Sequence, residues 1–355
     1  MRYFTQEVQT DGNIKRTAGV KARDDIDSIL TSKGWKPIQV FDTHKQGKKT
    51  IIDRTTDHFK VYNVWKQTLS SLKKNDVLLI QFPILNHTLF MGKIIRRLKR
   101  KGVSIVLLIH DLEILRKAVS KNATLISKIR LNLEEKSVLQ LADHIIAHNP
   151  NMVKVLKDMG IEQKKIVNLQ IFDYLIPEAV KEKDMLSLEK PLIIAGNLRR
   201  NKAAYVYTLP ETCNFNLYGI GYEDESKDNI KYHGSFPPDE LPDAMDGSFG
   251  LIWDGESSET CTGAYGAYLR INNPHKTSLY LACGIPVVIW KYAALSAFVE
   301  QHKCGILIES LNDYPKMISD ISESEYYSMC QNAKKVAQNL RSGYYTLLAL
   351  EQCGL

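Results

Sequence analysis

Short apolar runs alternate with amphipathic stretches from one end of the chain to the other. The runs have the length of β-strands, and the stretches between them repeat apolar positions every three or four residues, as helices do. In the first half the predicted strands are residues 35–41, 76–82, 103–110, 144–148 and 165–172, with a helix at 87–101. Strands that alternate with helices are typical of parallel sheets built from βαβ units. The pattern therefore predicts an α/β protein.

The pattern pauses at residues 177–190, a charged segment without strong periodicity, as is typical of a linker. It then restarts with predicted strands at residues 191–195, 214–218, 250–253, 286–290 and 305–309 and a helix at 274–283. We therefore predict two doubly wound, Rossmann-like domains, at residues 1–180 and 190–340, and a segment 341–355 that crosses back to the first domain. Their sheets would present their carboxyl ends, where ligands bind, to one interdomain cleft.

The composition makes some classes of function less favoured but does not identify a single one. A chain of 355 residues with 44% hydrophobic content is long enough for two domains. Its start lacks a secretory signal and no window has about 20 consecutive apolar residues, so we expect a soluble, cytoplasmic protein. Six cysteines without a CxxC pair favour reduced thiols. The net charge of +7 suits an anionic ligand, an anionic membrane or nucleic acid, and nucleic acid is least favoured because aromatics are not interleaved with the basic residues.

The segment richest in candidate chemistry is residues 249–290, which predicts a strand, a long polar loop, a helix and another strand. The helix follows Asn273 and has Pro274 at its first position, so its free N–H groups and positive dipole end point into the loop. His275 and Lys276 lie on the first turn, where Lys276 is placed to contact a diphosphate. The alternative is a capped surface helix with a solvated lysine.

A glycine-containing turn follows the first strand of the second half. It contains Gly196, Asn197 and Arg199. A glycine at such a turn has no Cβ to block the approach of a phosphate or sugar to the backbone. The turn is therefore a candidate donor contact, with an ordinary tight turn as the alternative.

Aromatic and acidic residues end two further strands of the second half. Tyr218 is a candidate to stack on a base or sugar, although packing is the commoner role of a terminal aromatic. Trp253 and Asp254 begin an acidic loop whose carboxylates can accept hydrogen bonds from sugar hydroxyls. The alternative for this loop is an ordinary solvated one.

In the first half, the strand at residues 103–109 delivers His110 and Asp111 at its carboxyl end, with Glu113 two residues further on. Transfer to an acceptor hydroxyl needs a carboxylate or imidazole within hydrogen-bond reach of that hydroxyl. We predict the base here, with Asp111 as the first candidate and Glu113 in reserve. An aspartate that caps the following helix is the alternative.

Two weaker signals lie elsewhere in the first half. Gly19 and Lys21 belong to a glycine-containing turn into a helix that begins near Val20, where donor phosphates or the acceptor are possible ligands. His148 and Asn149 end another strand and are expected to face the same cleft as His110.

Several absences also shape the prediction. The sequence has no GxxxxGK[ST] phosphate loop, and Gly219 and Gly221 lack the third glycine of the dinucleotide fingerprint. The triplet Asp25-Ile-Asp27 falls within a predicted helix, so we interpret it as a helix face. We therefore expect no metal site and no cofactor, with donor phosphates neutralised by lysine, arginine and a helix end.

One predicted helix ends in a basic cluster. Its members are Arg96, Arg97, Lys99, Arg100 and Lys101. A solvated helix face is the commoner interpretation of such a cluster. Peripheral contact with the inner face of the membrane is the alternative, and it suits an enzyme with a lipid-linked acceptor.

Seven stretches together resemble one bacterial family. They are AGVKARDD (18–25), LIHDLEILR (108–116), HNPNM (148–152), IFDYL (171–175), AGNL (195–198), FGLIWDG (249–255) and ETCTGAYGAYLRINNPHKTSLYL (259–281). In order and over nearly the whole chain, they resemble the β-1,6-galactofuranosyltransferases of O-antigen and capsule clusters. More remotely, the chain is similar to the glucosyltransferases that extend O-linked GlcNAc on serine-rich adhesins.

The resemblance implies a GT-B fold and surface-polysaccharide biosynthesis. It implies transfer of galactofuranose from UDP-galactofuranose to a hexose of a lipid-linked oligosaccharide, with inversion and without metal. Transfer from UDP-glucose to a protein- or lipid-linked glycan is the alternative within enzymes, and a noncatalytic nucleotide-sugar-binding partner of another transferase is the alternative outside them. The resemblance does not determine the oligomeric state, and a homo-oligomer is one alternative.

The resemblance also suggests residues that face the donor. They are Gly196, Asn197 and Arg199, Tyr218 beside the uracil, and Lys276 on the diphosphate near Asn273 and Tyr280. It assigns no base, so Asp111 stays the first candidate.

Overall fold

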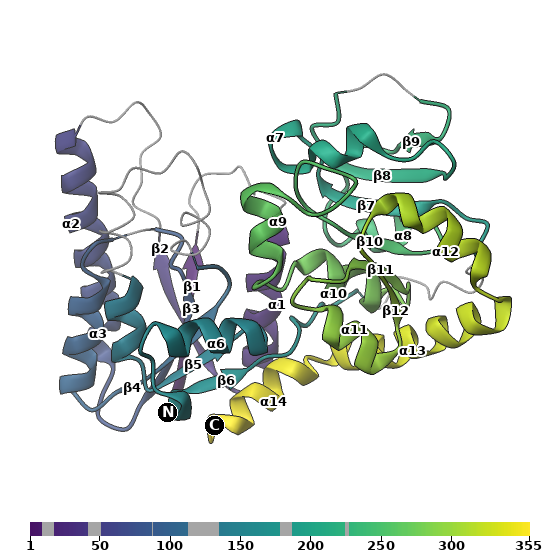
Figure 1. Cartoon of the computed structure of the whole chain (residues 1–355). Helices are drawn as coiled ribbons and strands as arrows, with labels where there is room; N and C mark the ends of the chain where they lie inside the picture. Colours follow the sequence, from purple (N-terminus) through teal and green to yellow (C-terminus); the bar gives the residue numbers. More distant parts are fainter. Residues whose placement is uncertain (9–17, 42–50, 87, 113–134, 178–186, 224–226) are drawn as a thin grey trace.

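The computed structural model describes residues 1–8, 18–41, 51–86, 88–112, 135–177, 187–223 and 227–355. Within them the strands form two sheets of six, and all neighbouring strands are parallel (Figure 1). One sheet belongs to the first half of the chain and the other to the second half. The expected α/β class with two doubly wound sheets is confirmed.

The first sheet has the strand order β2-β1-β3-β4-β5-β6. Its strands are β1 (Arg2–Val8), β2 (Lys36–Phe41), β3 (Val77–Phe82), β4 (Ser104–Ile109), β5 (His144–Ala147) and β6 (Ile166–Asn168). The described helices of this half are α1 (Ala18–Ser32), α2 (Ile51–Thr68), η1 (Leu69–Ser71), α3 (Met91–Arg100), α6 (Pro150–Asp158) and η2 (Gln163–Lys165).

The second sheet has the order β12-β11-β10-β7-β8-β9. Its strands are β7 (Leu192–Asn197), β8 (Phe215–Ile220), β9 (Ile230–Tyr232), β10 (Gly250–Ile252), β11 (Val287–Trp290) and β12 (Gly305–Ile308). The accompanying short helices are α7 (Arg200–Ala203), η3 (Ala204–Thr208), α8 (Leu241–Ala244), α9 (Gly263–Leu269), η4 (Leu311–Asp313) and α12 (Tyr314–Asp320). The remaining helices are α10 (His275–Ala282), α11 (Ser296–His302), α13 (Glu323–Ser342) and α14 (Tyr344–Gln352).

The first sheet is apolar on both faces, as a doubly wound sheet requires. Successive residues of β3 therefore enter different cores: Leu78 and Ile80 pack into one cluster and Leu79 into the other. The cluster that contains Leu79 continues into the second half through Ile171 and Leu192. One face of the first sheet thus shares its core with the second half.

The C-terminal helix α14 returns to the first half of the chain. Gly343 ends α13 in the left-handed conformation, with a φ of 75°, and a Cβ there would lie 2.8 Å from Cγ1 of Ile29 on α1. The carboxylate of Asp173 accepts hydrogen bonds from the backbone N–H groups of Tyr345 (3.2 Å) and Thr346 (2.7 Å) at the start of α14. Consequently α14 packs against β6 and α1 (Figure 1).

Several predicted elements differ from the observed ones. Strands β1 and β9 were not predicted, because β1 has three consecutive polar residues, Thr5 to Glu7, and β9 has only three residues. The strand expected at 165–172 ends at Asn168, since Gln170 has a φ of 73°. Pro274 precedes α10 as its N-cap instead of occupying its first position.

Two composition-based expectations concern the whole fold. No disulfide links any of the six cysteines, which all lie within the described residues, and all but the half-buried Cys213 are buried. Among the described residues, no helix combines the length and the apolar character that a membrane span requires.

Candidate active site

Residues at the carboxyl end of the first sheet form a set of hydrogen bonds to α9 and to the loop before α10 in the second half. The hydroxyl of Tyr268 on α9 donates a short hydrogen bond to the Asp111 carboxylate after β4 and accepts one from the Leu112 N–H at 3.1 Å. The Asn149 amide after β5 donates to the Ile271 carbonyl (2.7 Å) and to Oδ1 of Asn273 (2.8 Å). Helices α9 and α10 accordingly lie on the side of the second half that faces the first (Figure 1).

Asn273 is the centre of this junction. Its backbone N–H donates to Nδ1 of His148 at 3.0 Å, and its side-chain amide donates to the carbonyls of His148 (2.7 Å) and Gln170 (3.0 Å). Because Oδ1 accepts from Asn149, the buried side chain uses both amide hydrogens and its oxygen within the protein. The structure thus places Asn273 as a connection between the halves, beside the expected diphosphate contact of Lys276.

His148 is neutral by its surroundings. Its Nδ1 accepts from the Asn273 backbone, so Nε2 carries the proton that is donated to the Ile109 carbonyl at 2.9 Å. Burial lowers the pKa of His148 to about 4. The ring is therefore a neutral Nε2–H tautomer that uses both nitrogens in hydrogen bonds within the protein.

Lys276 lies on the first turn of α10, at the carboxyl end of β10. Its Nζ donates to the Trp253 carbonyl and forms an ion pair with Oδ1 of Asp254 at 3.1 Å, and both side chains are about 15% exposed. The first N–H groups of the helix have no partner in the preceding turn, and the positive end of the helix dipole lies here. Lysine, helix end and strand end therefore converge, and the carboxylate of Asp254, which we expected to accept from sugar hydroxyls, pairs with Lys276.

The end of β7 offers open backbone. Gly196 is exposed with a φ of 136°, and a Cβ there would meet nothing within 4 Å. Its neighbour Gly219 on β8 has a different role, since a Cβ there would lie 1.7 Å from the Gly196 carbonyl oxygen. Asn197 accepts a hydrogen bond from the N–H of the exposed Arg199 at 3.1 Å, which shapes this turn. A ligand can approach the backbone at Gly196.

Three aromatic residues expected near the donor are buried. Tyr218 is 1% exposed, stacks on His233 with ring centroids 4.6 Å apart, and its hydroxyl accepts from the Asp246 N–H. Trp253 is 0% exposed and its indole N–H donates to the Ser257 carbonyl. The hydroxyl of Tyr280 accepts from the Ala195 N–H at 2.7 Å, which supports the end of β7 from below the surface. These rings hold strand ends in position and offer no exposed face on which a nucleotide base could stack.

His275 packs into the junction beside Lys276. Its ring lies 4.9 Å from that of Tyr174 and 6.2 Å from that of Phe172, measured between centroids. Burial, and secondarily the Lys21 charge, lower the pKa of His275 to about 3. The side chain is neutral, and its Nε2 has no hydrogen-bond partner among the described residues.

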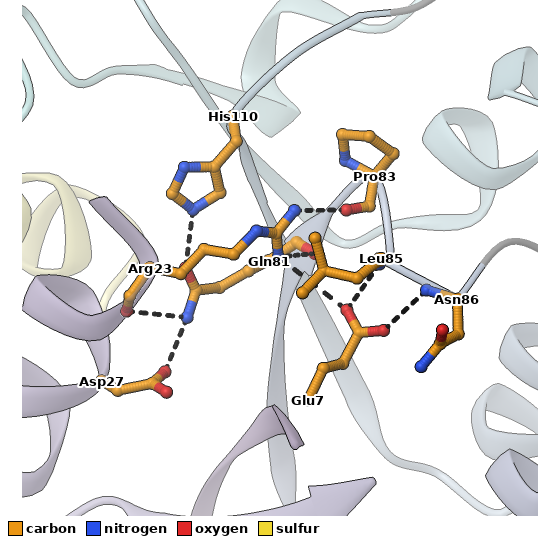
Figure 2. A network of polar contacts seen from close by, with 8 residues as sticks. All are labelled: Glu7, Arg23, Asp27, Gln81, Pro83, Leu85, Asn86 and His110. Carbon is orange, nitrogen blue, oxygen red and sulfur yellow. Dashed lines mark hydrogen bonds and ion pairs between the residues drawn. The ribbon is translucent and has the colours of Figure 1, made fainter. Parts of the chain in front are cut away.

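On the first half, His110 directly follows β4 and belongs to a polar network that the sequence pattern did not indicate (Figure 2). Its Nε2 lies 2.6 Å from Oε1 of Gln81 on β3, and its ring stacks on Phe172 with centroids 5.3 Å apart. Burial lowers the pKa of His110 well below its usual value, and the charge of Arg23 adds to this effect. The ring is therefore neutral.

Arg23 of α1 and Glu7 of β1 complete this network. The Arg23 guanidinium donates to the carbonyls of Gln81 (3.2 Å) and Pro83 and lies 3.8 Å from Oε1 of Glu7. The Glu7 carboxylate accepts from the N–H groups of Leu85 (2.8 Å) and Asn86 (3.1 Å), as Figure 2 shows. The only sequence signal was a polar residue within or beside an apolar run, such as Gln81 in DVLLIQF.

The expected turn at Gly19 is part of α1, which begins at Ala18, so the expectation of a turn there was wrong. The buried Lys21 forms an ion pair with Asp25 and donates to the Leu175 carbonyl at 2.7 Å. Its ammonium group is therefore engaged by partners within the protein. Asp25 and Asp27 lie on the helix face that was predicted for them and bind protein groups. Glu113 lies outside the described residues.

Both halves of the chain are similar to known proteins. The chain matches the glucosyltransferase 3-like N-terminal domain over residues 3–171 and the C-terminal domain over residues 192–353. It is 35% identical over 341 residues to the β-1,6-galactofuranosyltransferase WbbI of Escherichia coli, covering 95% of this chain and 94% of the relative. It is 24% identical to glucosyltransferase 3 of Streptococcus parasanguinis, covering 78% of each chain.

A solved structure extends the comparison to the fold. HepE from Anabaena, in complex with UDP, superposes with a TM-score of 0.58 at 11% identity and covers 100% of both chains. That likeness, together with two parallel six-stranded sheets, identifies the GT-B fold. The chain therefore belongs to the glucosyltransferase 3-like family of GT-B glycosyltransferases and is similar to bacterial β-1,6-galactofuranosyltransferases.

Proposed function

We propose that this chain transfers galactofuranose from UDP-galactofuranose to a hexose of a lipid-linked surface-polysaccharide precursor, with inversion at the anomeric carbon and without a metal ion. The similarity to WbbI over 95% of the chain supports this donor and product class. The single observation that carries the chemistry is the position of Lys276 on the first turn of α10, across the junction from His110 and Asp111.

The donor diphosphate would bind at the start of α10. Phosphate oxygens would replace Asp254 as partners of the Lys276 Nζ and accept from the free N–H groups of the first turn. Gly196 would admit the donor to the end of β7, with Asn197 and Arg199 beside it. These contacts would stabilise the negative charge that develops on UDP as it leaves.

The acceptor would bind at the ends of β1, β3 and β4. Its hydroxyl would attack the anomeric carbon from the face opposite UDP, which gives inversion in a single displacement. The proton of that hydroxyl needs a base on the first half, where His110 and Asp111 follow β4.

The acceptor class also suggests a membrane surface. Lys93, Arg96, Arg97 and Arg100 of α3 are exposed, and we name them the α3 basic edge. Beside it, the 51% exposed Phe59 lies 4.8 Å from Phe90, measured between ring centroids. An exposed aromatic next to a basic helix suits peripheral contact of a cytoplasmic enzyme with anionic lipids. Lys99 is paired with Asp143 and Lys101 binds the Ser70 carbonyl, so they contribute less.

A second candidate donor is UDP-glucose, with a protein- or lipid-linked glycan as acceptor. The match of both halves to glucosyltransferase 3-like domains favours this candidate. The two donors share the diphosphate contacts and differ at the sugar.

A donor screen tests the proposal. Purified protein is incubated with UDP-galactofuranose, UDP-galactopyranose, UDP-glucose or UDP-GlcNAc and octyl glycosides, with and without EDTA, and both UDP release and the product anomer are measured. We expect transfer from UDP-galactofuranose alone. The transfer should persist in the presence of EDTA, and the product should have the inverted anomeric configuration. Transfer from UDP-glucose supports the second candidate, and UDP binding without transfer from any donor contradicts both.

A further inference from the structure

Gln81 is a buried polar side chain in the middle of the first sheet, 3% exposed, and it joins Asp27 to His110 (Figure 2). Its Nε2 donates to Oδ1 of Asp27 at 2.6 Å and to the Arg23 carbonyl at 3.3 Å. Its Oε1 lies 2.6 Å from Nε2 of His110. The three side chains thus form one chain of hydrogen bonds from α1 through β3 to the end of β4.

These contacts determine which way the Gln81 amide points. The Arg23 carbonyl has no hydrogen to give, so the group of Gln81 that lies 3.3 Å from it must be the amide nitrogen, whose second hydrogen points to Asp27. The amide oxygen must therefore face His110. Because that oxygen only accepts, Nε2 of His110 carries the ring proton and donates it.

The neutral ring then has its lone pair on Nδ1. The charged groups that act on His110 are Arg23 and, when protonated, His148 and His275, and together with burial they disfavour the imidazolium. No described residue hydrogen-bonds to Nδ1 of His110. His148 has the same tautomer, but its Nδ1 is occupied by the Asn273 N–H. Of the two rings, His110 is the one whose lone pair is left for another molecule.

The neighbouring carboxylate is placed differently. Asp111 accepts the hydroxyl hydrogen of Tyr268 from the second half, so it contributes to the contact between halves. The His110 ring stacks on Phe172, and Phe172 is also a neighbour of His275, which is adjacent to Lys276. His110 is thus close to the predicted leaving-group site without belonging to it.

We propose that Gln81, oriented by Asp27, is a positioning residue that fixes the Nε2–H tautomer of His110, so that His110 and not Asp111 is the general base. Nδ1 of His110 takes the proton of the acceptor hydroxyl while the oxygen of that hydroxyl forms the new bond to the anomeric carbon. The bond from that carbon to the β-phosphate oxygen breaks, and UDP leaves with the electron pair. This inference rests on the proposed transfer reaction.

The first experiment reads the tautomer without any reaction. Protein labelled with ¹⁵N-histidine is studied by two-bond ¹H–¹⁵N NMR at neutral pH, and the His110 signal is assigned by its loss in His110→Gln. We expect a protonated Nε2 and an unprotonated Nδ1. A protonated Nδ1 in the wild-type protein overturns the inference, whether or not transfer has been observed.

The second experiment compares Gln81→Met with Gln81→Glu. Methionine keeps the volume but removes the acceptor, so the tautomer becomes mixed and kcat falls about 10-fold, a part of the roughly 10²- to 10⁴-fold effect of a general base. Glutamate restores an oxygen that accepts from Nε2, and its other oxygen can share one proton with Asp27 in place of the amide hydrogen bond, so it recovers the tautomer and most of kcat. The negative charge of this carboxyl pair lies closer to His110 than that of Asp27 alone, so it should also raise the pKa of His110 and move the acidic limb of the kcat–pH profile to higher pH.

A purely structural role gives a different pattern. It predicts loss of UDP affinity and melting temperature together with kcat, and no shift of the acidic limb. Gln39→Met, on β2 of the same sheet, is the matched control and should leave kcat unchanged. If His110→Gln keeps near wild-type kcat while Asp111→Asn loses it, the inference is overturned even though the proposed transfer stands. If the wild-type protein transfers from no donor, the proposed function fails, and the tautomer measurement still decides the role of Gln81.

Discussion

The Lys276 Nζ lies 3.1 Å from Oδ1 of Asp254, which holds the lysine at the end of β10 before any donor binds. The pair is largely shielded from solvent, and the Trp253 carbonyl is its second anchor. A diphosphate that reaches this lysine therefore meets a cation whose position is already set. Such preorganisation reduces the entropy that is lost on binding.

Lys276→Met should weaken UDP binding by roughly 2 kcal/mol, which is about 30-fold, because a charge-assisted contact to the diphosphate is lost. Isothermal titration calorimetry measures the change. Lys190→Met, which removes an exposed pairing with Asp246, is the control and should leave affinity unchanged. Equal UDP affinity in Lys276→Met and the wild-type protein would rule out the diphosphate contact.

Gly196→Ala should fold and yet bind the nucleotide-sugar donor at least about 10-fold more weakly. A Cβ at Gly196 meets no protein atom within 4 Å, so it would project into the space proposed for the donor. The positive φ of 136° adds roughly 1–3 kcal/mol of strain. Gly160→Ala places a methyl group at another positive φ, 85°, with equally open surroundings, away from the proposed donor site, and it is the control. Loss of stability in both variants with unchanged donor affinity in Gly196→Ala would contradict the assignment.

The hydrogen bond between Tyr268 and Asp111 should contribute to the contact between halves. In a double-mutant cycle with Tyr268→Phe and Asp111→Asn, we expect a coupling free energy of about 1–2 kcal/mol, as for a hydrogen bond to a charged group. Urea unfolding measures it. The exposed pair of Lys190 and Asp246 should show a coupling below about 1 kcal/mol in the same assay. A coupling near zero for the Tyr268 pair would mean that the contact is incidental.

His148 should make the protein less stable in acid. Its pKa is about 4 in the folded protein and about 6.5 when unfolded, so the unfolded state binds the proton more readily. The contribution of the neutral ring is therefore complete above pH 6.5 and is lost as the pH falls from 6.5 toward 4.

The measurement is the difference in unfolding free energy between the wild-type protein and His148→Gln. From pH 8 to pH 5 the wild-type protein should lose about 2 kcal/mol relative to the variant. Taking the difference removes groups with the opposite trend, such as Asp27, whose pKa burial raises to about 7. A difference that does not change with pH would show that His148 is not held neutral.

The α3 basic edge should bind anionic vesicles. Replacing Arg96, Arg97 and Arg100 by alanine should lower partitioning onto phosphatidylglycerol vesicles by roughly 10-fold or more, since each charge near an anionic surface contributes about 1 kcal/mol. Co-sedimentation at low and high salt measures this, with Lys231, Lys303 and Lys335 of the second half replaced as the control. Equal partitioning of both triple variants would leave no role for α3 at the membrane.

The local sequence pattern predicted many of the strands and helices, because the apolar runs and turn residues that define these elements lie close together in the chain. Apolar runs such as residues 76–82 and 103–110 are long enough to be recognised as buried strands, and β3 and β4 lie within them. The beginning of α10 followed from Pro274 to within one residue, and Lys276 followed from its place on that turn. β1 was missed because its carboxyl end carries Gln6 and Glu7, polar residues that belong to the network around Arg23.

The sequence by itself thus determined the fold class, the family resemblance and the turn of helix that carries Lys276. The tertiary structure decided which polar side chains meet. Gln81 contacts His110 because β3 and β4 are neighbours in register, and it contacts Asp27 because α1 covers that part of the sheet. It also decided that Tyr218 is covered and that Asp111 is engaged by Tyr268. Strand order, register and helix packing set these contacts between residues far apart in the chain, and a local pattern carries no record of them.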